Sequence, residues 1–290
     1  MAERILQDIA EQNKRLTIAQ INKNTEEKAE AYYNLGRAYY FLEDFHRAIE
    51  YLRQYLSIAE EVGDIEGAGR AYNKLGSAYQ SLGDYHRAIE YDNQHLTIAK
   101  EVGDRAWEGC AYGNLGLAYL SLKEFQRAIE YHNQHLTIAK EVDNRECQGK
   151  AYRNLGVAYC SLKEFQRAIE YHNQHLIIAK EVGDRAGEGC AYFNLGLAYH
   201  SLEEFQRAIE CHNQHLGIAK EVGNRACQGK AYLNLGLAYH SLEKFQQAIE
   251  YHNQHLSIAK ELGDRVGQGH AYSNLGDAYD SLEEFQRAIE

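Results

Sequence analysis

Apolar residues recur along the chain at helical spacing, and the whole pattern returns every 40 residues. Each copy contains two apolar stripes separated by a short turn such as Ser-Leu-Lys-Glu. In the copy that begins near residue 105, the first stripe holds Ala111, Leu115, Ala118 and Leu122, and the second holds Phe125, Ala128, Ile129, Leu136, Ala139 and Val142. Intervals of three and four residues place each stripe on one face of a helix. The pattern therefore predicts two antiparallel helices per copy, helix A followed by helix B.

The string Ala-Tyr-x-x-Leu-Gly-x-Ala-Tyr marks seven copies, and a fixed period of this kind is typical of a repeat architecture. It begins at Ala31, Ala71, Ala111, Ala151, Ala191, Ala231 and Ala271. Complete pairs of helices are expected from about residues 25, 65, 105, 145, 185 and 225. We interpret 1–290 as a single solenoid domain.

The two ends of the chain depart from this pattern. Residues 1–20 match a helix B, whereas 265–290 hold a helix A followed by an interrupted helix B. We therefore interpret the chain as part of a longer array. The incomplete last repeat is expected to fray and to expose Leu275, Ala278 and Leu282, which would permit self-association because terminal repeats need a polar cap.

Capping residues support these boundaries. Asp104 is expected to cap one helix A, and either Asn24 or Thr25 the first. Glycines are expected to end several of the helices B in the left-handed conformation, and Asp143 replaces one of them at some cost in stability. These glycines are Gly103, Gly183, Gly223 and Gly263. Gly109 and Gly116 lie inside a helix A, where we expect the backbone of a neighbouring helix to approach closely.

The repeat resembles the tetratricopeptide repeat. The residues that carry the resemblance in one copy are Leu115, Gly116, Tyr119, Phe125, Ala128 and Leu136. The copies are longer than the usual repeat, Tyr112 stands where tryptophan is common, and the chain has no proline. These departures, together with the strings Asn-Leu-Gly and His-Leu-x-Ile-Ala-Lys-Glu-x-Gly-Asp-Arg, resemble the Pins/LGN type of G-protein signalling modulator. Kinesin light chain repeats are a more distant likeness. The resemblance implies an all-α, right-handed α-solenoid whose helices A line a concave groove that binds protein partners.

The composition of the chain argues against several classes of function. The formal net charge of −11 argues against nucleic-acid binding, which needs clustered Lys and Arg. Neither a signal peptide nor an apolar stretch long enough to span a membrane is visible. The six cysteines lack Cys-x-x-Cys spacing, and several replace other residue types at matching repeat positions. A disulfide framework would need fixed partners, so we predict a reducing, cytoplasmic location.

One helical stripe of helix A varies between copies, and this variation marks the candidate site. Residues that pack one repeat against the next must be alike in every copy. A stripe that varies between copies is therefore not used for that packing. In one copy the stripe holds Ala106, Cys110, Gly113, Leu117 and Leu120. Beside it runs a ladder of asparagines interrupted at Lys74: Asn34, Asn114, Asn154, Asn194, Asn234 and Asn274. Their amides could bracket the peptide groups of an extended ligand. Alternatively, each Asn bonds the backbone of the next helix.

The remaining candidate residues give the stripe an apolar and basic middle section. They are Tyr33, Arg37, Leu117, Lys150, Arg153, Val157, Phe193, Leu197, His200, Lys230, Leu233, Leu237 and His240. Such a groove suits a peptide with apolar anchors and carboxylates. The alternative is ordinary variation of a protein surface, on which single apolar residues are normal.

Histidines offer a competing interpretation. His132 and His135 recur in the later copies, and such a pair could ligate zinc. Leu52 and Tyr55 occupy the same places in the first full repeat, which favours a packing role. We therefore predict no metal and no cofactor.

No catalytic motif or long irregular loop is present, which favours a protein-interaction scaffold over an enzyme. The scaffold could be a signalling or cell-polarity adaptor, or a cargo adaptor of the kinesin light chain kind. A heptad segment before the array would favour the cargo adaptor, and Gα-binding motifs after it the signalling protein. Neither lies within these residues, so Gα binding is not assigned to this chain.

Overall fold

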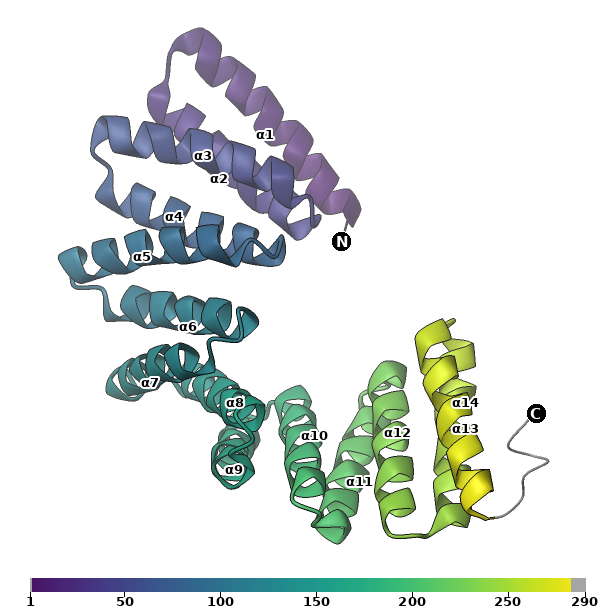
Figure 1. The fold of residues 1–290 in the computed structure, drawn as a ribbon. Coiled ribbons are helices and arrows are strands. Elements are labelled where there is room, and N and C mark those ends of the chain that lie inside the picture. The colour runs from purple at the N-terminus through teal and green to yellow at the C-terminus, as the bar shows by residue number, and fades with distance from the viewer. Residues whose placement is uncertain (1, 283–290) are drawn as a thin grey trace. The chain divides into compact units, whose positions relative to one another are not determined.

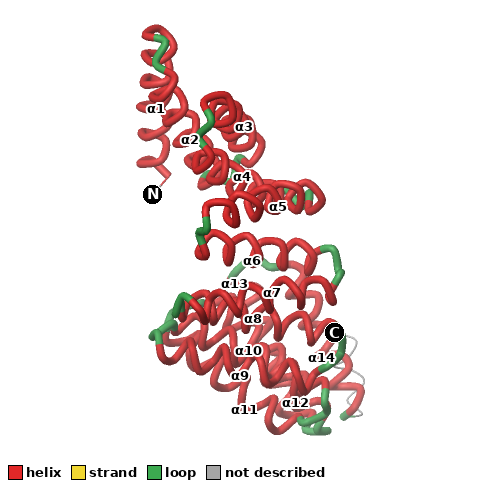
Figure 2. Tube along the Cα trace, turned by 90° about the vertical axis from the view of Figure 1, so that its left-hand side faces the viewer, coloured by secondary structure: helices red, strands yellow, loops and turns green. Residues whose placement is uncertain are grey.

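The structure is a computed structural model that describes residues 2–282. Over that range it is built from helices joined by short turns, with no strand (Figures 1 and 2). The all-α repeat array predicted from the sequence is confirmed. The helices are α1 (Ala2–Asn22), α2 (Thr25–Phe41), α3 (Phe45–Val62), α4 (Ile65–Ser81), α5 (Tyr85–Val102), α6 (Arg105–Ser121), α7 (Phe125–Glu141), α8 (Arg145–Ser161), α9 (Phe165–Glu181), α10 (Arg185–Ser201), α11 (Phe205–Glu221), α12 (Arg225–Ser241), α13 (Phe245–Glu261) and α14 (Arg265–Ser281).

Even-numbered helices are helices A, and odd-numbered ones are helices B. The predicted starts of the helices A agree with the structure to within a residue, and α1 occupies the place predicted for an isolated helix B. The interrupted helix B predicted after α14 lies outside the described residues. Contacts divide the chain into two compact units, Met1–Asn144 and Arg145–Glu290. That all repeats form a single domain stays a prediction.

Helix ends follow from local hydrogen bonding. Asp104 accepts a bond from the backbone N of Trp107 at 2.9 Å, and Asn24, rather than Thr25, caps the first helix A. Gly103 has φ 71°, and Asp143 holds the equivalent left-handed position at φ 51°. The A-to-B turns also use this conformation, as at Lys123 with φ 62°, and a glycine holds the equivalent position at Gly83 with φ 78°. The Cβ of Lys123 makes this conformation less favourable than it would be for glycine.

Packing within a repeat buries small and branched side chains between the two helices. Ala111 and Leu115 are fully buried, whereas Tyr119 stacks on Tyr131 of the paired helix with ring centroids 5.2 Å apart. Arg127 covers the same stack, with its guanidinium 5.4 Å from the Tyr119 ring. The stacked pair closes the repeat on the side away from the core.

Two expectations about burial are wrong. Val142 is 43% exposed, because it caps α7 beyond the face that packs on α6. Leu275 and Ala278 are buried against Ile249 and Leu256 of α13, so α14 does not expose them.

A long-range ion pair recurs in the later repeats. Each pair joins the first residue of helix A to the last glutamate of the following helix B. The pairs are Arg105–Glu141, Arg145–Glu181, Arg185–Glu221 and Arg225–Glu261. Their side chains are about half exposed, so solvent screens each pair and its contribution to stability is small.

Helices A of neighbouring repeats touch each other within each unit, whereas among the described residues neighbouring helices B do not. In the unit of residues 145–282, α8 contacts α10, α10 contacts α12, and α12 contacts α14. The repeats are therefore spaced more tightly along the side formed by the helices A. A stack with this asymmetry curves toward its helices A, which is where the candidate stripe lies.

Candidate functional site

The unit of residues 145–282 contains an apolar groove that crosses three successive helices A. Val157 of α8, Leu197 of α10 and Leu237 of α12 occupy equivalent repeat positions and line it together. The cavity measures about 490 Å³ and also includes Cys160, Ser161, Phe165, His172, Asn194, His200, Ser201 and Asn234. Six of the residues named from the sequence thus meet in one groove: Val157, Asn194, Leu197, His200, Asn234 and Leu237.

The apolar groove remains open to solvent. Leu197 is 37% exposed and Leu237 is 36% exposed, which is unusual for side chains that line a hollow between helices. His200 spans two repeats, with Nε2 3.4 Å from Ser241 Oγ and its ring edge-on to Phe205. Burial lowers the pKa of His200 from its usual value. The groove therefore offers an apolar floor with a hydrogen-bonding rim.

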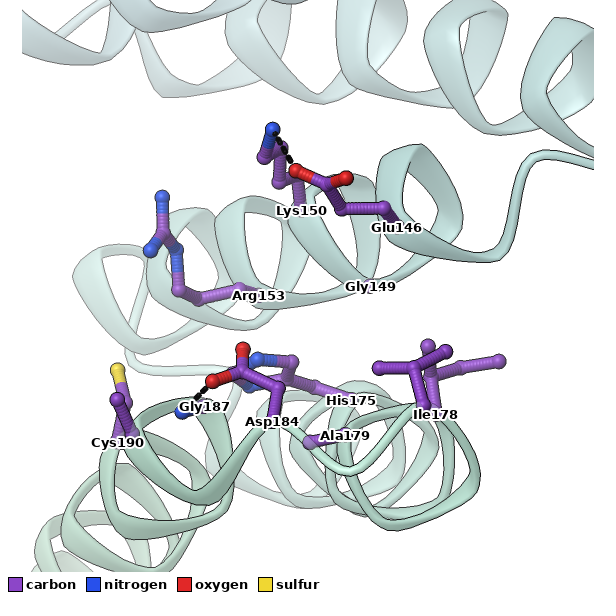
Figure 3. Close-up of a pocket in the computed structure, with 12 residues that line it drawn as sticks. Glu146, Gly149, Lys150, Arg153, His175, Ile178, Ala179, Asp184, Gly187 and Cys190 are labelled. Atoms are coloured by element: carbon purple, nitrogen blue, oxygen red, sulfur yellow. Dashed lines mark hydrogen bonds and ion pairs between the residues drawn. The ribbon is translucent and has the colours of Figure 1, made fainter.

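A second hollow of about 520 Å³ lies between α8, α9 and α10, and we call it the Arg153 pocket (Figure 3). Lys150 and Arg153 project from α8, across from Asp184 and Cys190. Lys150 Nζ is paired with Glu146 at 2.7 Å. Arg153 Nε donates to Asn154 Oδ1 at 3.4 Å, and within the described residues its two terminal amino groups have no hydrogen-bond partner. The pocket therefore presents one guanidinium able to receive a carboxylate.

The asparagine ladder makes different bonds from repeat to repeat. Asn34 donates to Gln12 Oε1 at 3.5 Å, Asn114 to Asp92 Oδ1 at 3.2 Å, and Asn194 to Cys190 Sγ at 3.7 Å. Asn234 donates to the carbonyl of Lys230 on its own helix at 2.8 Å, and Asn154 is buried.

None of these hydrogen bonds runs to the backbone of the next helix, which was the alternative role considered for the ladder. Each amide also retains part of its hydrogen-bonding capacity, since an asparagine has two N–H donors and one carbonyl acceptor. The role of the ladder in binding stays a prediction.

Other candidate residues lie apart from the apolar groove. Tyr33 lines a small hollow with Trp107 and packs on Tyr55, and the Arg37 guanidinium lies 5.7 Å from the Tyr33 ring. Phe193 packs edge-on against His215 with centroids 5.2 Å apart. Candidates outside the groove lining also include Leu117, Lys230, Leu233, His240 and Asn274.

The groove residues outside the candidate set are Cys160, Ser161, Phe165, His172 and Ser201. Phe165 and His172 belong to helix B, so the varying stripe of helix A does not indicate them.

The recurrent histidines are packing residues. His172, His212 and His252 are fully buried, and neither nitrogen of any of these rings has a hydrogen-bond partner. Burial, together with the smaller effect of the neighbouring His175, lowers the pKa of His172 to about 4. Among residues 2–282, no group of three or more His, Cys, Asp or Glu side chains is arranged to hold a metal ion. No helix in that range is both long and apolar enough to cross a membrane.

Comparisons with known proteins agree on the fold. Models of the tetratricopeptide repeat family match residues 29–62, 67–141, 148–221 and 228–290. No curated protein matches the sequence.

Three solved structures illustrate the similarity. A STAND signal transduction ATPase with a tetratricopeptide repeat sensor, from Pyrococcus horikoshii, is 18% identical with a TM-score of 0.78, over 90% of this chain and 41% of that one. The quorum sensor NprR from B. thuringiensis in its apo form is 19% identical with a TM-score of 0.73, over 98% of this chain and 80% of that one. A putative kinesin light chain from Podosopora anserina is 21% identical with a TM-score of 0.59, over 67% and 95% of the two chains. Identities this low show the fold alone.

Proposed function

Because the chain belongs to the tetratricopeptide repeat family, we propose that it is a protein-interaction scaffold that binds an extended or partly helical segment of a partner protein in the apolar groove. The supporting observation is that Val157, Leu197 and Leu237 stand at equivalent positions of three successive repeats and line one open groove. A segment crossing the helices A would meet one apolar side chain per repeat. Recognition by regularly spaced apolar anchors is a known mode of peptide binding.

The Arg153 pocket extends the proposal to charge. An acidic side chain of the bound segment would pair with Arg153, whose terminal amino groups point to no carboxylate of the described chain. Pairs with arginine are strengthened when both partners are charged. Replacing Arg153 with Glu should therefore slow association and reverse its salt dependence. An unchanged association rate would remove this pocket from the binding surface.

Family likeness suggests the biological setting. The Pyrococcus horikoshii relative carries its repeats as a sensor, and NprR is a quorum sensor. These neighbours favour a signalling adaptor. We propose that this chain is not itself an enzyme, because its sequence contains no catalytic motif. We further propose that the chain is of the Pins/LGN type and acts in the cytoplasm, which rests on the repeat length, the recurrent strings and the cysteine pattern. The second candidate, a cargo adaptor, is favoured by the likeness to the putative kinesin light chain.

Selection of ligands from a random peptide library on the full chain tests the proposal. Peptides that bind are measured by isothermal titration calorimetry against the natural chain and two variants. Leu237→Asp places a charge on the groove floor and should weaken binding tenfold or more, equal to about 1.4 kcal/mol. Gln206→Ala, at an exposed position of α11, is the matched control and should bind normally. Failure to select any peptide, or equal affinity for Leu237→Asp, would refute the groove as the binding site.

A further inference from the structure

Helices A of neighbouring repeats face each other in a constant register, in which a residue meets the one 37 or 41 positions later. Asn73 Nδ2 of α4 lies 3.4 Å from Cys110 Sγ of α6, a separation of 37. His200 Nε2 of α10 lies 3.4 Å from Ser241 Oγ of α12, a separation of 41. Tyr40 Oη lies 3.3 Å from Ser81 Oγ, also with a separation of 41. The two separations differ by four residues, or about one helical turn.

This register brings two cysteines into opposition. Cys190 of α10 and Cys227 of α12 are separated by 37 residues, like Asn73 and Cys110, and lie one turn nearer to the N-termini of their helices. Helices α10 and α12 are in direct contact. Burial raises the pKa of the Cys190 thiol, and Cys227 is among the groups whose charge raises it further. The two cysteines therefore occupy facing positions on adjacent helices.

Both thiols have the accessibility that chemistry requires. Cys190 and Cys227 are reduced and only partly buried. Cys190 lines the Arg153 pocket, and its Sγ accepts a hydrogen bond from Asn194 Nδ2 at 3.7 Å. The positive charge of Arg153 and this N–H both favour the thiolate over the thiol at Cys190. With these neighbours, the Cys190 thiol can lose its proton and attack a disulfide formed at Cys227.

We propose that Cys190 and Cys227 form a redox site, in which a low-molecular-weight disulfide converts the two thiols into a disulfide that joins α10 to α12. The Cys227 thiolate attacks one sulfur of the small disulfide, breaks its S–S bond and releases one thiolate. Cys190 then loses its proton and attacks Cys227 Sγ, which releases the second thiolate. Two cysteine thiols are oxidised, one small disulfide is reduced to two thiols, and the two protons pass to those thiols.

Burial explains the order of the two attacks. Because the pKa of the Cys190 thiol is raised, this residue is less suited to begin the exchange with a dilute reagent. In the second step its target is fixed on the neighbouring helix, so the attack is intramolecular and needs a smaller thiolate fraction. The resulting disulfide would hold together the two helices that contribute Asn194, Leu197, Asn234 and Leu237 to the apolar groove.

Peptide mapping of the full chain under non-reducing conditions tests the site. The reduced protein is equilibrated with glutathione disulfide, its remaining thiols are alkylated, and it is digested with trypsin. The sequence places the two cysteines in separate tryptic peptides, residues 186–207 and 226–230. We expect these two peptides to appear joined, and to separate after reduction. Cys190→Ser and Cys227→Ser should each abolish the joined species, whereas Cys160→Ser should retain it.

A thermal melt gives an independent readout. A disulfide between Cys190 and Cys227 closes a loop that contains α11 and lowers the conformational entropy of the unfolded chain. The oxidised protein should therefore melt several degrees above the reduced one. This gain in melting temperature should vanish in Cys227→Ser. The proposal is overturned if the chain carries only mixed disulfides with glutathione, if other cysteines pair in preference, or if the joined peptides arise only from covalent dimers in the intact mass. Each of these outcomes would mean that Cys190 and Cys227 do not form the preferred disulfide within one chain.

Discussion

The imidazole of His172 occupies the space that a side chain at Gly156 would fill, since a Cβ there would lie 2.4 Å from His172 Cε1. The same relationship joins Gly196 to His212 and Gly236 to His252. In the first two full repeats the glycine accommodates a different side chain, Leu52 at Gly36 and Asp92 at Gly76. The glycine inside helix A is therefore retained for the space it leaves, whatever residue helix B supplies.

Gly156→Ala should destabilise the protein even though alanine is the better helix former. The gain in helix propensity is about 1 kcal/mol, whereas overpacking a filled core costs about 1–3 kcal/mol. The His172 ring is fully buried and has no room to retreat, so we expect a net loss of about 1 kcal/mol in urea unfolding. Gly217→Ala in α11 is the control, because nothing lies within 4 Å of an added Cβ there. Equal stabilisation by both substitutions would contradict the packing argument.

Acid should unfold the protein through its buried histidines. The pKa of His172 is lowered to about 4 by burial and then by His175, and the pKa of His212 to about 3 by burial and then by His215 and His200. An unfolded histidine titrates near 6.5, so the unfolded chain binds more protons between about pH 6.5 and 4. The stabilising effect of the neutral rings is complete above pH 6.5 and is lost as the pH falls toward 4.

Urea titrations from pH 7.5 to 4.5 would measure this dependence. At pH 5, each ring shifted to about 4 should cost about 2 kcal/mol relative to pH 7.5. His172→Leu, which introduces the residue found at the equivalent position 52, should reduce the slope of stability against pH by about one proton. A slope unchanged by this substitution would show that His172 does not titrate in the window.

Asp92 should have the opposite pH dependence. Its pKa is raised to about 7, mainly by burial. Asn114 Nδ2 donates a hydrogen bond to Asp92 Oδ1 at 3.2 Å, and this bond lowers the pKa and so opposes part of the effect of burial. Because the folded pKa lies above the unfolded one, the contribution of Asp92 to stability is fully present below about pH 4 and is lost as the pH rises through about 7. Asp92→Asn removes the buried charge and keeps the acceptor for Asn114. It should raise the melting temperature more at pH 8 than at pH 5, because the cost of keeping Asp92 protonated in the folded state grows from about pH 4 to about pH 7. The reverse pattern would show that the carboxylate is stabilised where it lies.

The repeat length and residue types were enough to predict the helices and most of the core. Ala111 and Leu115 recur because identical neighbours impose identical packing, so a sequence period translates directly into a structural one. The internal glycines also indicated a close approach. The approaching group is the His132 ring rather than a backbone, since a Cβ on Gly116 would lie 2.5 Å from His132 Cε1. Sequence spacing along one helix does not show which side chain of the other helix fills the gap.

The candidate site was predictable only in part. Val157, Leu197 and Leu237 of the varying stripe line the apolar groove, because a stripe that is free to vary is not used for repeated packing. Their role in binding stays a prediction. The varying stripe did not indicate that Phe193 lies against His215, away from the groove lining. Whether a stripe residue lines a hollow or packs on a ring depends on helix B, whose contacts have no signature in the helix A sequence. The opposition of Cys190 and Cys227 likewise depends on the register between repeats.

Asn194 and Asn234 provide the decisive comparison for the asparagine ladder, because both line the apolar groove but their amides are engaged differently. Asn194 Nδ2 makes a long 3.7 Å bond to a sulfur, whereas Asn234 Nδ2 makes a 2.8 Å bond to the backbone of its own helix. If the ladder holds the main chain of a bound segment, Asn194→Ala should weaken binding of a selected peptide by about 1 kcal/mol, the usual net value of one hydrogen bond. The melting temperature of the Asn194→Ala variant should change little, because the hydrogen bond that this substitution removes is weak.

Calorimetric affinity and thermal melts are to be measured together for Asn194→Ala, Asn234→Ala and the outer-helix control Gln206→Ala. A lowered melting temperature with unchanged affinity for Asn194→Ala would mean that the ladder is structural and that the groove recognises its ligand through the apolar positions alone.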